Sequence, residues 1–280
     1  MKKLGFIDYY LDEWHANNYP AWIEEYNKAN GTDYKLLYAW GEIDKPNNGM
    51  TNSAWCEKFG CEQCSSIEEL CENSDHVIIL APSDPERHLD YAKKVFECGV
   101  SPYIDKTFAP DLKTAVEIFE LAEKNGVKFF SSSALRYADE LSGFNGDAVS
   151  AVFTGGGSNI EEYIIHQIEM AVKVLGVGAS SLRYEAHADQ VRIDVVYQNG
   201  KNASLFYAPC MPFTAAVSNK DGISSYSSIN SQYFKKLIAD IISFFETGKA
   251  SFEPSETLEV MKIRDGVIRG KANQNIWISL

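Results

Sequence analysis

Residues of the right type and spacing for proton-transfer chemistry occur at two places in the chain. Glu162, His166 and Glu169 are separated by four and three positions, so a helix that contains them carries all three on one face. Lys106 directly follows a predicted strand at 102–105, and in open α/β sheets ligands bind at the carboxyl ends of strands. Because histidine, carboxylates and lysine serve as general acids and bases, these residues are the first catalytic candidates.

The face formed by Glu162, His166 and Glu169 allows two other interpretations. An acidic amphipathic helix with His166 as a packing residue has the same spacing. Three ligands on adjacent turns can also meet one divalent metal ion. We favour proton transfer and predict no bound metal.

Strand and helix patterns alternate around Lys106. We predict strands at 4–8, 34–40, 76–81, 102–105 and 127–132 and helices at 86–97 and 111–125, the last with Leu112, Ala115, Val116, Phe119 and Ala122 facing inward. This alternation is typical of an α/β protein with a Rossmann-like doubly wound parallel sheet, here over residues 1–136. Ligand-binding loops are then expected at 83–88, 105–110 and 131–136.

The second half of the chain has a different pattern. Its predicted strands lie at 148–154, 182–188, 191–198, 203–208, 213–218 and 276–280, and its helices at 163–175, 232–247 and 256–269. We expect an α+β domain with a mainly antiparallel open sheet and helices on one side. The predicted domains are 1–143 and 144–280, joined by a Gly/Asn/Asp passage at 143–147, and the glycines at 155–157 predict a flexible joint. Since exposed sheet faces commonly pair between subunits, we expect a homo-oligomer, either a dimer or a tetramer.

The turn after the first strand is unusual for a dinucleotide-binding fold. The sequence G-x-G-x-x-G is expected there, because glycines permit close approach of the backbone to a pyrophosphate. This chain has Asp8, Tyr10 and Glu13 at the glycine positions. The carboxylates of Asp8 and Glu13 would repel the pyrophosphate, so we predict weak or shifted dinucleotide binding that Asp8→Gly would strengthen. His15, just beyond this turn, belongs either to a ligand patch or to the hydrogen bonding of the helix start.

The composition excludes several classes of partner. A net charge of −13 and a pI near 4.9 disfavour nucleic acid and anionic membrane surfaces, which bind clustered Lys and Arg. No apolar run approaches the roughly 18 residues of a membrane span, and no secretory signal precedes the first strand, so we expect a cytoplasmic protein with a small-molecule substrate.

Three of the six cysteines have a spacing found in iron–sulfur proteins. Cys56, Cys61 and Cys64 follow the pattern C-x4-C-x2-C. The surrounding segment nevertheless has an ordinary helix–strand–helix pattern, so we expect reduced and partly buried thiols rather than a metal cluster.

Several motifs together resemble one enzyme family. The order apolar strand, Pro82, His88, helix, Gly99, strand, Asp105-Lys106, helix, strand, Arg136 resembles the glucose–fructose oxidoreductase/inositol dehydrogenase (Gfo/Idh/MocA) family of nicotinamide-dependent enzymes. The family's Glu-Lys-Pro appears here as Asp105-Lys106-Thr107. The family's Asp-x-Gly-x-His-x-x-Asp helix is similar to the segment with Glu162, Ile164, His166 and Glu169.

The resemblance implies an oxidoreductase that uses NAD or NADP to act on a sugar, polyol or related hydroxy compound. Lys106, His166 and Glu162 would transfer the proton that an alcohol loses as its hydride leaves. The implied cofactor contacts are Asp8, Tyr10, Glu42, Pro82, Ser83, His88 and Asp105, and the implied substrate contacts are Arg136, Glu169 and His15. Lys106 and His166 are expected to line one pocket with Ser83 and Asp84.

Two alternative functions stay open. The replaced glycines favour a non-catalytic ligand-sensing or scaffold protein that has lost its cofactor. The same acidic and basic residues could instead perform non-redox acid–base or metal-dependent chemistry.

Overall fold

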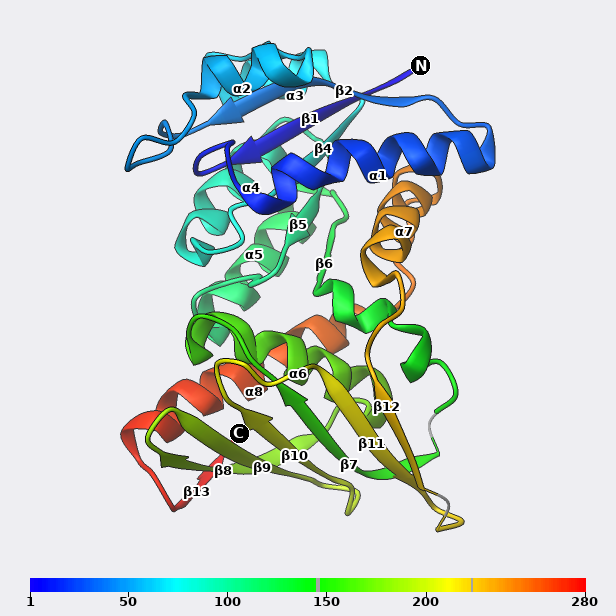
Figure 1. Ribbon diagram of the computed structural model, residues 1–280. Coiled ribbons are helices and arrows are strands. Elements are labelled where there is room, and N and C mark those ends of the chain that lie inside the picture. Colours follow the sequence, from blue (N-terminus) through cyan, green and yellow to red (C-terminus); the bar gives the residue numbers. More distant parts are fainter. Residues whose placement is uncertain (145–146, 223) are drawn as a thin grey trace. The chain divides into compact units, whose positions relative to one another are not determined.

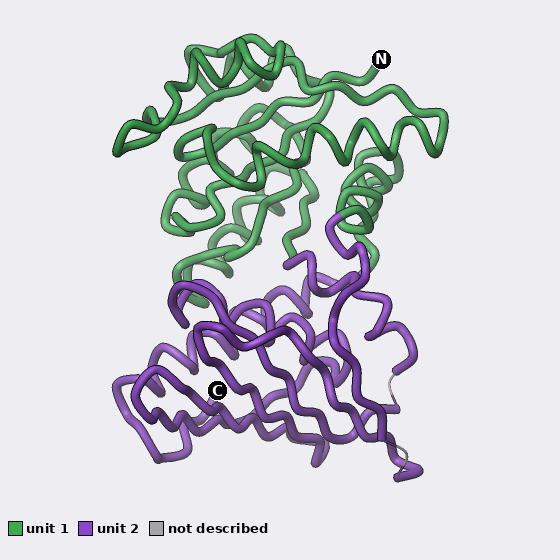
Figure 2. Tube along the Cα trace, viewed as in Figure 1, with its two compact units in different colours: residues 1–132, 235–251 green, residues 133–234, 252–280 purple. Residues whose placement is uncertain are grey.

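The computed structural model describes residues 1–144, 147–222 and 224–280, and the chain forms two compact units (Figure 2). Unit 1 contains residues 1–132 and 235–251, and unit 2 contains residues 133–234 and 252–280. The change of unit therefore falls at 132/133 rather than at the predicted 143/144, and the chain returns to unit 1 for one short segment. Part of the predicted passage at 143–147 lies outside the described residues.

Unit 1 is built on a six-stranded parallel sheet (Figure 1). Its strands are β1 (Lys2–Asp8), β2 (Tyr34–Gly41), β3 (Glu62–Gln63), β4 (His76–Ile79), β5 (Tyr103–Asp105) and β6 (Phe130–Ser132). They follow the order β3-β2-β1-β4-β5-β6, with every pair parallel. This is the doubly wound Rossmann order, and it confirms the predicted fold class. The order reverses between β1 and β4, where such folds bind their ligands.

Helices connect the strands of unit 1. They are α1 (Trp14–Asn30), α2 (Asn52–Phe59), α3 (Ile67–Asn73), α4 (His88–Glu97) and α5 (Leu112–Asn125), with the 3₁₀ turn η1 (Pro85–Arg87) before α4. Local signals fix their ends: Thr51, Ser66 and Asp111 accept hydrogen bonds at helix N-termini, and Gly31, Gly60 and Gly126 adopt left-handed conformations after helix C-termini.

One predicted core position is wrong. Val116 of α5 is exposed, whereas Ile118, which the prediction omitted, is fully buried. The inward face of α5 therefore follows Ala115, Ile118 and Ala122 at intervals of three and four residues.

Helix α7 (Tyr233–Thr247) lies mainly in unit 1, although the sequence placed it in the second domain. Aromatic packing explains this assignment. The ring of Phe244 lies 5.1 Å from that of Phe130, and the ring of Phe245 stacks on His76 at 4.5 Å.

Unit 2 contains a seven-stranded sheet of order β12-β11-β7-β10-β9-β8-β13. Its strands are β7 (Ala148–Gly155), β8 (Ala179–His187), β9 (Gln190–Tyr197), β10 (Asn202–Tyr207), β11 (Thr214–Asn219), β12 (Ser224–Ser228) and β13 (Trp277–Ser279). Among the described residues only the pair β7–β10 is parallel, which confirms a mainly antiparallel sheet. The serine-rich strand β12 was not predicted.

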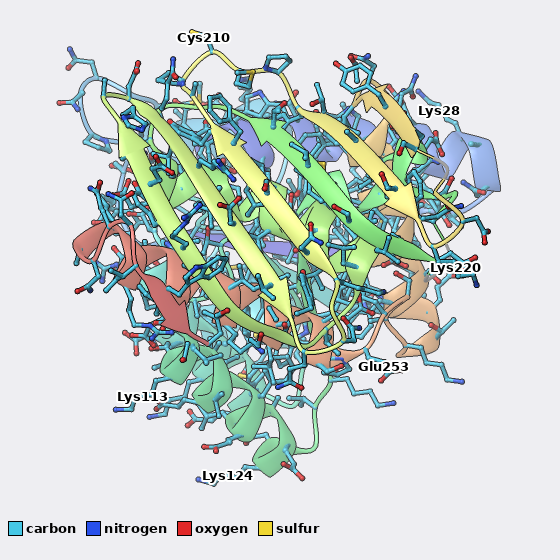
Figure 3. All side chains as sticks on the ribbon, turned by 90° about the horizontal axis from the view of Figure 1, so that it is seen from below. Lys28, Lys113, Lys124, Cys210, Lys220 and Glu253 are labelled. Carbon is cyan, nitrogen blue, oxygen red and sulfur yellow. The ribbon has the colours of Figure 1, made fainter. Side chains whose placement is uncertain are left out.

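Two helices, α6 (Ile160–Leu175) and α8 (Pro254–Ala272), pack on one face of this sheet. The 3₁₀ turns η2 (Ala134–Tyr137) and η3 (Asp139–Leu141) lie beside α6. In the described part of unit 2, no helix covers the opposite face, whose side chains project toward the viewer in Figure 3.

The glycines at 155–157 serve close packing of the backbone. A Cβ on Gly156 would lie 2.2 Å from the carbonyl oxygen of Ala208 and 2.8 Å from the amide nitrogen of Met211. The amide of Gly157 also donates to the carbonyl of Pro209 at 3.1 Å. This segment is thus held against 208–211 rather than left as an open joint.

We expect Gly156→Ala to destabilise the protein by about 1–3 kcal/mol, because the methyl group meets rigid backbone atoms. Urea unfolding followed by circular dichroism measures the change. Gly143→Ala is the control, since no described atom lies within 4 Å of its added Cβ. Equal midpoints for the two variants would refute the close-packing role.

Candidate active site

The turn between β1 and α1 is clamped by Asn52, the first residue of α2. Asn52 Oδ1 accepts a hydrogen bond from the Leu11 amide at 3.1 Å. Its Nδ2 donates to the carbonyls of Gly41 and Ile43, at 3.1 and 2.9 Å. The Leu11 side chain is fully buried beneath this clamp. A side-chain amide and an apolar anchor thus organise the turn that glycines organise in a standard dinucleotide-binding loop.

Glu13 caps the N-terminus of α1 with its own carboxylate. Oε2 accepts from the His15 amide at 2.8 Å, and Oε1 accepts a short hydrogen bond from the Ala16 amide. These are the free N–H groups, at the positive end of the helix dipole, to which a pyrophosphate binds in Rossmann folds. An internal anion therefore occupies the phosphate-binding position of α1.

Asp8 ends β1 with a buried carboxyl group. Its Oδ1 accepts from the amides of Tyr9 and Ala81, at 2.7 and 3.0 Å, while Oδ2 is buried without a hydrogen-bond partner. Burial, and then the nearby Glu13 carboxylate, raise the pKa of Asp8 well above its ordinary value. Ala81 adopts a left-handed conformation with φ of 62°, which is uncommon for a residue other than glycine. The Asp8 carboxyl group holds its amide in this conformation.

At the end of β5, Asp105 and Lys106 are both buried. Asp105 Oδ1 accepts from the Tyr103 hydroxyl at 3.0 Å, and Oδ2 lies 3.8 Å from His15 Nδ1. Lys106 Nζ donates to the Pro82 carbonyl at 3.3 Å. The ligand edge of unit 1 thus presents a lysine and an aspartate at adjacent positions, and both residue types can act as general acids or bases.

His15 connects the two acidic groups of this edge. The same nitrogen, Nδ1, lies 3.2 Å from Glu13 Oε2 and 3.8 Å from Asp105 Oδ2. Burial acts to lower the pKa of His15, but the carboxylates of Asp105 and Glu13 outweigh it and raise the pKa. We call Asp8, Glu13, His15, Asp105 and Lys106 the switch-point cluster.

Glu42 lies just beyond β2, and its carboxylate forms a hydrogen bond and an ion pair. It accepts from the Tyr91 hydroxyl at 2.6 Å and pairs with Arg87 at 3.2 Å. The Arg87 guanidinium also lies over the Tyr9 ring, 4.8 Å from its centroid. Beside these residues is an open hollow of about 400 Å³, which Asp90, Lys93 and Lys94 also line.

The other predicted cofactor contacts have different environments. Tyr10 has the Lys45 ammonium 6.0 Å from its ring centroid, and Pro82 offers its carbonyl to Lys106. Ser83 follows Pro82 in the loop before η1. His88 is fully buried, with its ring nitrogens against the carbonyls of Leu80 and Phe108. It therefore joins two loops and is not accessible to a ligand.

In unit 2, His166 and Glu162 lie on α6 as predicted. His166 Nδ1 shares a 2.7 Å hydrogen bond with the Ser133 hydroxyl, which fixes the ring. The rings of Tyr163 and Phe213 flank it at 5.8 and 5.6 Å. Glu162 accepts from the Asn159 side chain at 3.2 Å near the start of the helix. His166 is thus oriented by Ser133, and a positioned imidazole of this kind can act as a general base.

Arg136 and Glu169, the predicted substrate contacts, form a buried ion pair. Arg136 Nη1 donates to Glu169 Oε1 at 2.7 Å, and Nη2 donates to Glu256. The guanidinium carbon lies 3.8 Å from the Phe252 ring centroid. Burial raises the pKa of Glu169, although Arg136 opposes the shift. These contacts occupy both side chains and join η2 to α6 and α8.

The structure therefore gathers Asp8, His15, Asp105 and Lys106 in unit 1 and His166, Glu162 and Glu169 in unit 2. A shared pocket for Lys106 and His166 stays a prediction. Sequence reasoning missed two positioning residues, Asn52 and Ser133. Asn52 resembles an ordinary helix-start residue, whereas Ser133 lay in a loop already marked as a candidate.

No metal site was found among the described residues. They contain no group of three His, Cys, Asp or Glu side chains placed to hold an ion. Glu162, His166 and Glu169 instead form hydrogen bonds with Asn159, Ser133 and Arg136, respectively.

None of the helices in the described ranges combines the length and apolar character that a membrane crossing needs.

Comparison with known sequences supports the family resemblance. Residues 42–133 match the Gfo/Idh/MocA family, described as "Oxidoreductase family, NAD-binding Rossmann fold". Over 63 residues the chain is 30% identical to the uncharacterized oxidoreductase YhhX of Escherichia coli K12, an alignment that covers 22% of this chain and 18% of that protein. The resemblance predicted from the motifs is confirmed for this part of unit 1.

Solved structures share the fold over the full length. An oxidoreductase from Agrobacterium radiobacter, crystallised with NAD+, L-tartaric acid and magnesium, gives a TM-score of 0.76 at 14% identity, covering 99% of this chain and 98% of that one. UDP-N-acetylglucosamine 3-dehydrogenase GnnA from Acidithiobacillus ferrooxidans gives 0.74 at 14% identity, covering 96% and 97%.

The dinucleotide of this fold fits only part of the ligand edge. Glu42 and the hollow beside it lie near the end of β2, where the adenosine ribose is bound in Rossmann folds. The N-terminus of α1 does not fit a pyrophosphate while the Glu13 carboxylate holds the same N–H groups. Asp8 repels a pyrophosphate less than an ordinary aspartate would, because its raised pKa favours the neutral carboxyl group.

We expect the free energy of unfolding of Asp8→Asn to increase relative to that of the wild type as the pH rises. A buried carboxyl with a raised pKa stabilises the fold below its ordinary pKa, and this contribution is lost as the pH climbs to the raised value. Within that window the loss is about 1.4 kcal/mol per pH unit, and an uncharged asparagine lacks it.

Urea unfolding of wild type and Asp8→Asn between pH 4 and pH 9 measures this difference. Asp12→Asn is the control. The hydrogen bond from the Asn17 side chain is the main cause of a lowered pKa at Asp12, so its stability difference from wild type should not change in the same direction with pH. A constant difference between wild type and Asp8→Asn across the range would contradict a protonated Asp8.

Proposed function

Because residues 42–133 carry the NAD-binding Rossmann fold of the Gfo/Idh/MocA oxidoreductases, we propose that this protein is an NAD(P)-dependent dehydrogenase of a small hydroxy compound. The observation that carries the proposal is Lys106, buried beside Asp105 at the carboxyl edge of a sheet with the Rossmann strand order. A sugar or polyol is the proposed substrate class. The fold shared with a UDP-N-acetylglucosamine dehydrogenase supports this class without defining it.

The proposed chemistry divides between a cofactor and protein side chains. When bound, the nicotinamide would accept the hydride of a secondary alcohol. Lys106 would accept the hydroxyl proton, and the neighbouring Asp105 would stabilise the resulting ammonium group. His166, oriented by Ser133, would be the second proton-transfer residue, with Glu162 on the same helix. Contact of both groups with one substrate is part of the proposal.

A second candidate function follows from Glu13. If its carboxylate remained on the N-terminus of α1, the chain would be a ligand-sensing or scaffold protein that keeps the fold without using a dinucleotide. Direct titration with NADH and NADPH separates the two candidates. Measurable binding of either supports the dehydrogenase, and absence of binding to both supports the sensor.

The proposal includes a homo-oligomer, either a dimer or a tetramer. The uncovered face of the unit 2 sheet supports it (Figure 3). The apolar side chains of Val152 in β7 and Val196 in β9 are also exposed. The molar mass in solution is the deciding measurement.

We expect Glu13→Gly to bind NADH at least about tenfold more tightly than wild type, a difference of about 1.4 kcal/mol. The change removes a charge and frees the amides of His15 and Ala16, while glycine is tolerated at a helix N-cap. Isothermal titration calorimetry gives the Kd. The control Glu24→Gln removes a charge from an exposed position of α1, where Glu24 pairs with Lys28, and should leave the Kd unchanged. Unaltered affinity in Glu13→Gly would show that the cap does not compete.

We expect Lys106→Met and His166→Asn each to lower kcat by about 10²–10⁴-fold, since each removes a proposed proton-transfer group. The assay follows NADH formation from NAD+ with a panel of sugars and polyols. Lys113→Met, at an exposed position labelled in Figure 3, is the control and should keep wild-type turnover. If both variants kept their NADH affinity and their kcat, the proposed catalytic roles would be wrong while dinucleotide binding would stand.

A further inference from the structure

Cys56 and Cys61 occupy paired positions at the C-terminus of α2. The Cys61 amide donates to the Cys56 carbonyl at 3.1 Å, and the Gly60 amide donates to the Glu57 carbonyl at 3.3 Å. Gly60 between them is left-handed, with φ of 67°. These two hydrogen bonds define a Schellman motif, in which the side chains at the positions of Cys56 and Cys61 commonly contact each other. The helix end therefore brings two thiols together by main-chain geometry.

The two thiols differ in access and acidity. Cys56 is buried and Cys61 is partly exposed, and neither forms a disulfide. A hydrogen bond from the Cys61 thiol lowers the pKa of Cys56, and the same contact raises the pKa of Cys61. The pair can thus lose one proton while the remaining S–H stabilises the thiolate, and the partly exposed sulfur can be reached by a small molecule.

The position of the pair gives it a connection to the ligand edge. Asn52 at the N-terminus of α2 holds the β1–α1 turn, and the Trp55 indole of the same helix donates to the Asn17 side chain of α1 at 2.8 Å. A covalent bond at the other end of α2 would tie this helix to the start of β3.

We propose that Cys56 and Cys61 form a redox-active dithiol, which a small-molecule disulfide converts into an intramolecular disulfide bond. The shared proton first passes from Cys61 to the buried Cys56, and the partly exposed Cys61 thiolate attacks one sulfur of the small disulfide. This step forms a mixed disulfide at Cys61 and releases one thiol, and Cys56 then loses its proton again. The Cys56 thiolate then attacks the Cys61 sulfur and releases the second thiol. The protein loses two electrons and two protons, and the small disulfide is reduced to two thiols.

Oxidised glutathione is the probe, added to the full-length reduced protein before free thiols are alkylated. Trypsin cleaves after Lys58, between the two cysteines, so a Cys56–Cys61 bond links two peptides that reduction separates. Fragmentation of the linked pair distinguishes Cys61 from Cys64 and Cys71 in the second peptide. We expect this bond to form at least tenfold faster than glutathione adds to Cys210, an exposed cysteine in a loop of unit 2 (Figure 3).

Two variants make the result decisive. In Cys61→Ser the linked peptides should disappear, and Cys56 should stay reduced because it is buried. Cys210→Ser is the matched control and should form the Cys56–Cys61 bond at the wild-type rate. A Cys56 bond to Cys64 or Cys71 in the wild type, or oxidation no faster than at Cys210, would overturn the proposal. Since the readout needs neither dinucleotide nor turnover, it is independent of the proposed dehydrogenase activity.

Discussion

The Glu13 carboxylate on the first turn of α1 is the interaction on which the ligand edge of unit 1 depends. It satisfies two amides that a Rossmann fold normally leaves for a phosphate, and it places a negative charge at the switch point of the sheet. The neighbouring groups are consistent with that charge. His15 lies against Glu13 and Asp105, and burial raises the pKa of Asp8.

Buried charged groups in unit 2 also lie beside groups of opposite charge. Arg136 would be costly inside the protein by itself, but Glu169 and Glu256 accept its hydrogen bonds and Phe252 covers its flat face. This network fixes η2 beside α6, and η2 begins next to Ser133, the hydrogen-bond partner of His166. The residue with the strongest catalytic pattern is therefore positioned by a structural ion pair that sequence reasoning had assigned to substrate binding.

The two ends of α2 each hold a neighbouring part of unit 1 in place. Asn52 replaces the organising role of the glycines in the β1–α1 turn, because one side-chain amide satisfies both an amide of this turn and two carbonyls after β2. At the other end of the helix, the Schellman motif pairs two thiols. In a sheet with the Rossmann strand order, side-chain contacts thus organise a turn for which the standard loop relies on backbone alone.

The sequence by itself determined the doubly wound parallel class of the first sheet, the mainly antiparallel second sheet and the likeness to the Gfo/Idh/MocA family, because hydrophobic period and motif residues can be recognised over a few neighbouring positions. It also determined that Glu162, His166 and Glu169 share one face of α6. Only the tertiary structure decided the strand order, the packing of α7 in unit 1, the pairing of Arg136 with Glu169, and the cap that Glu13 forms on α1 beside a buried Asp8 whose pKa is raised. The reason is that burial sets a carboxyl group's protonation and partners, and burial is created by segments far apart in the chain.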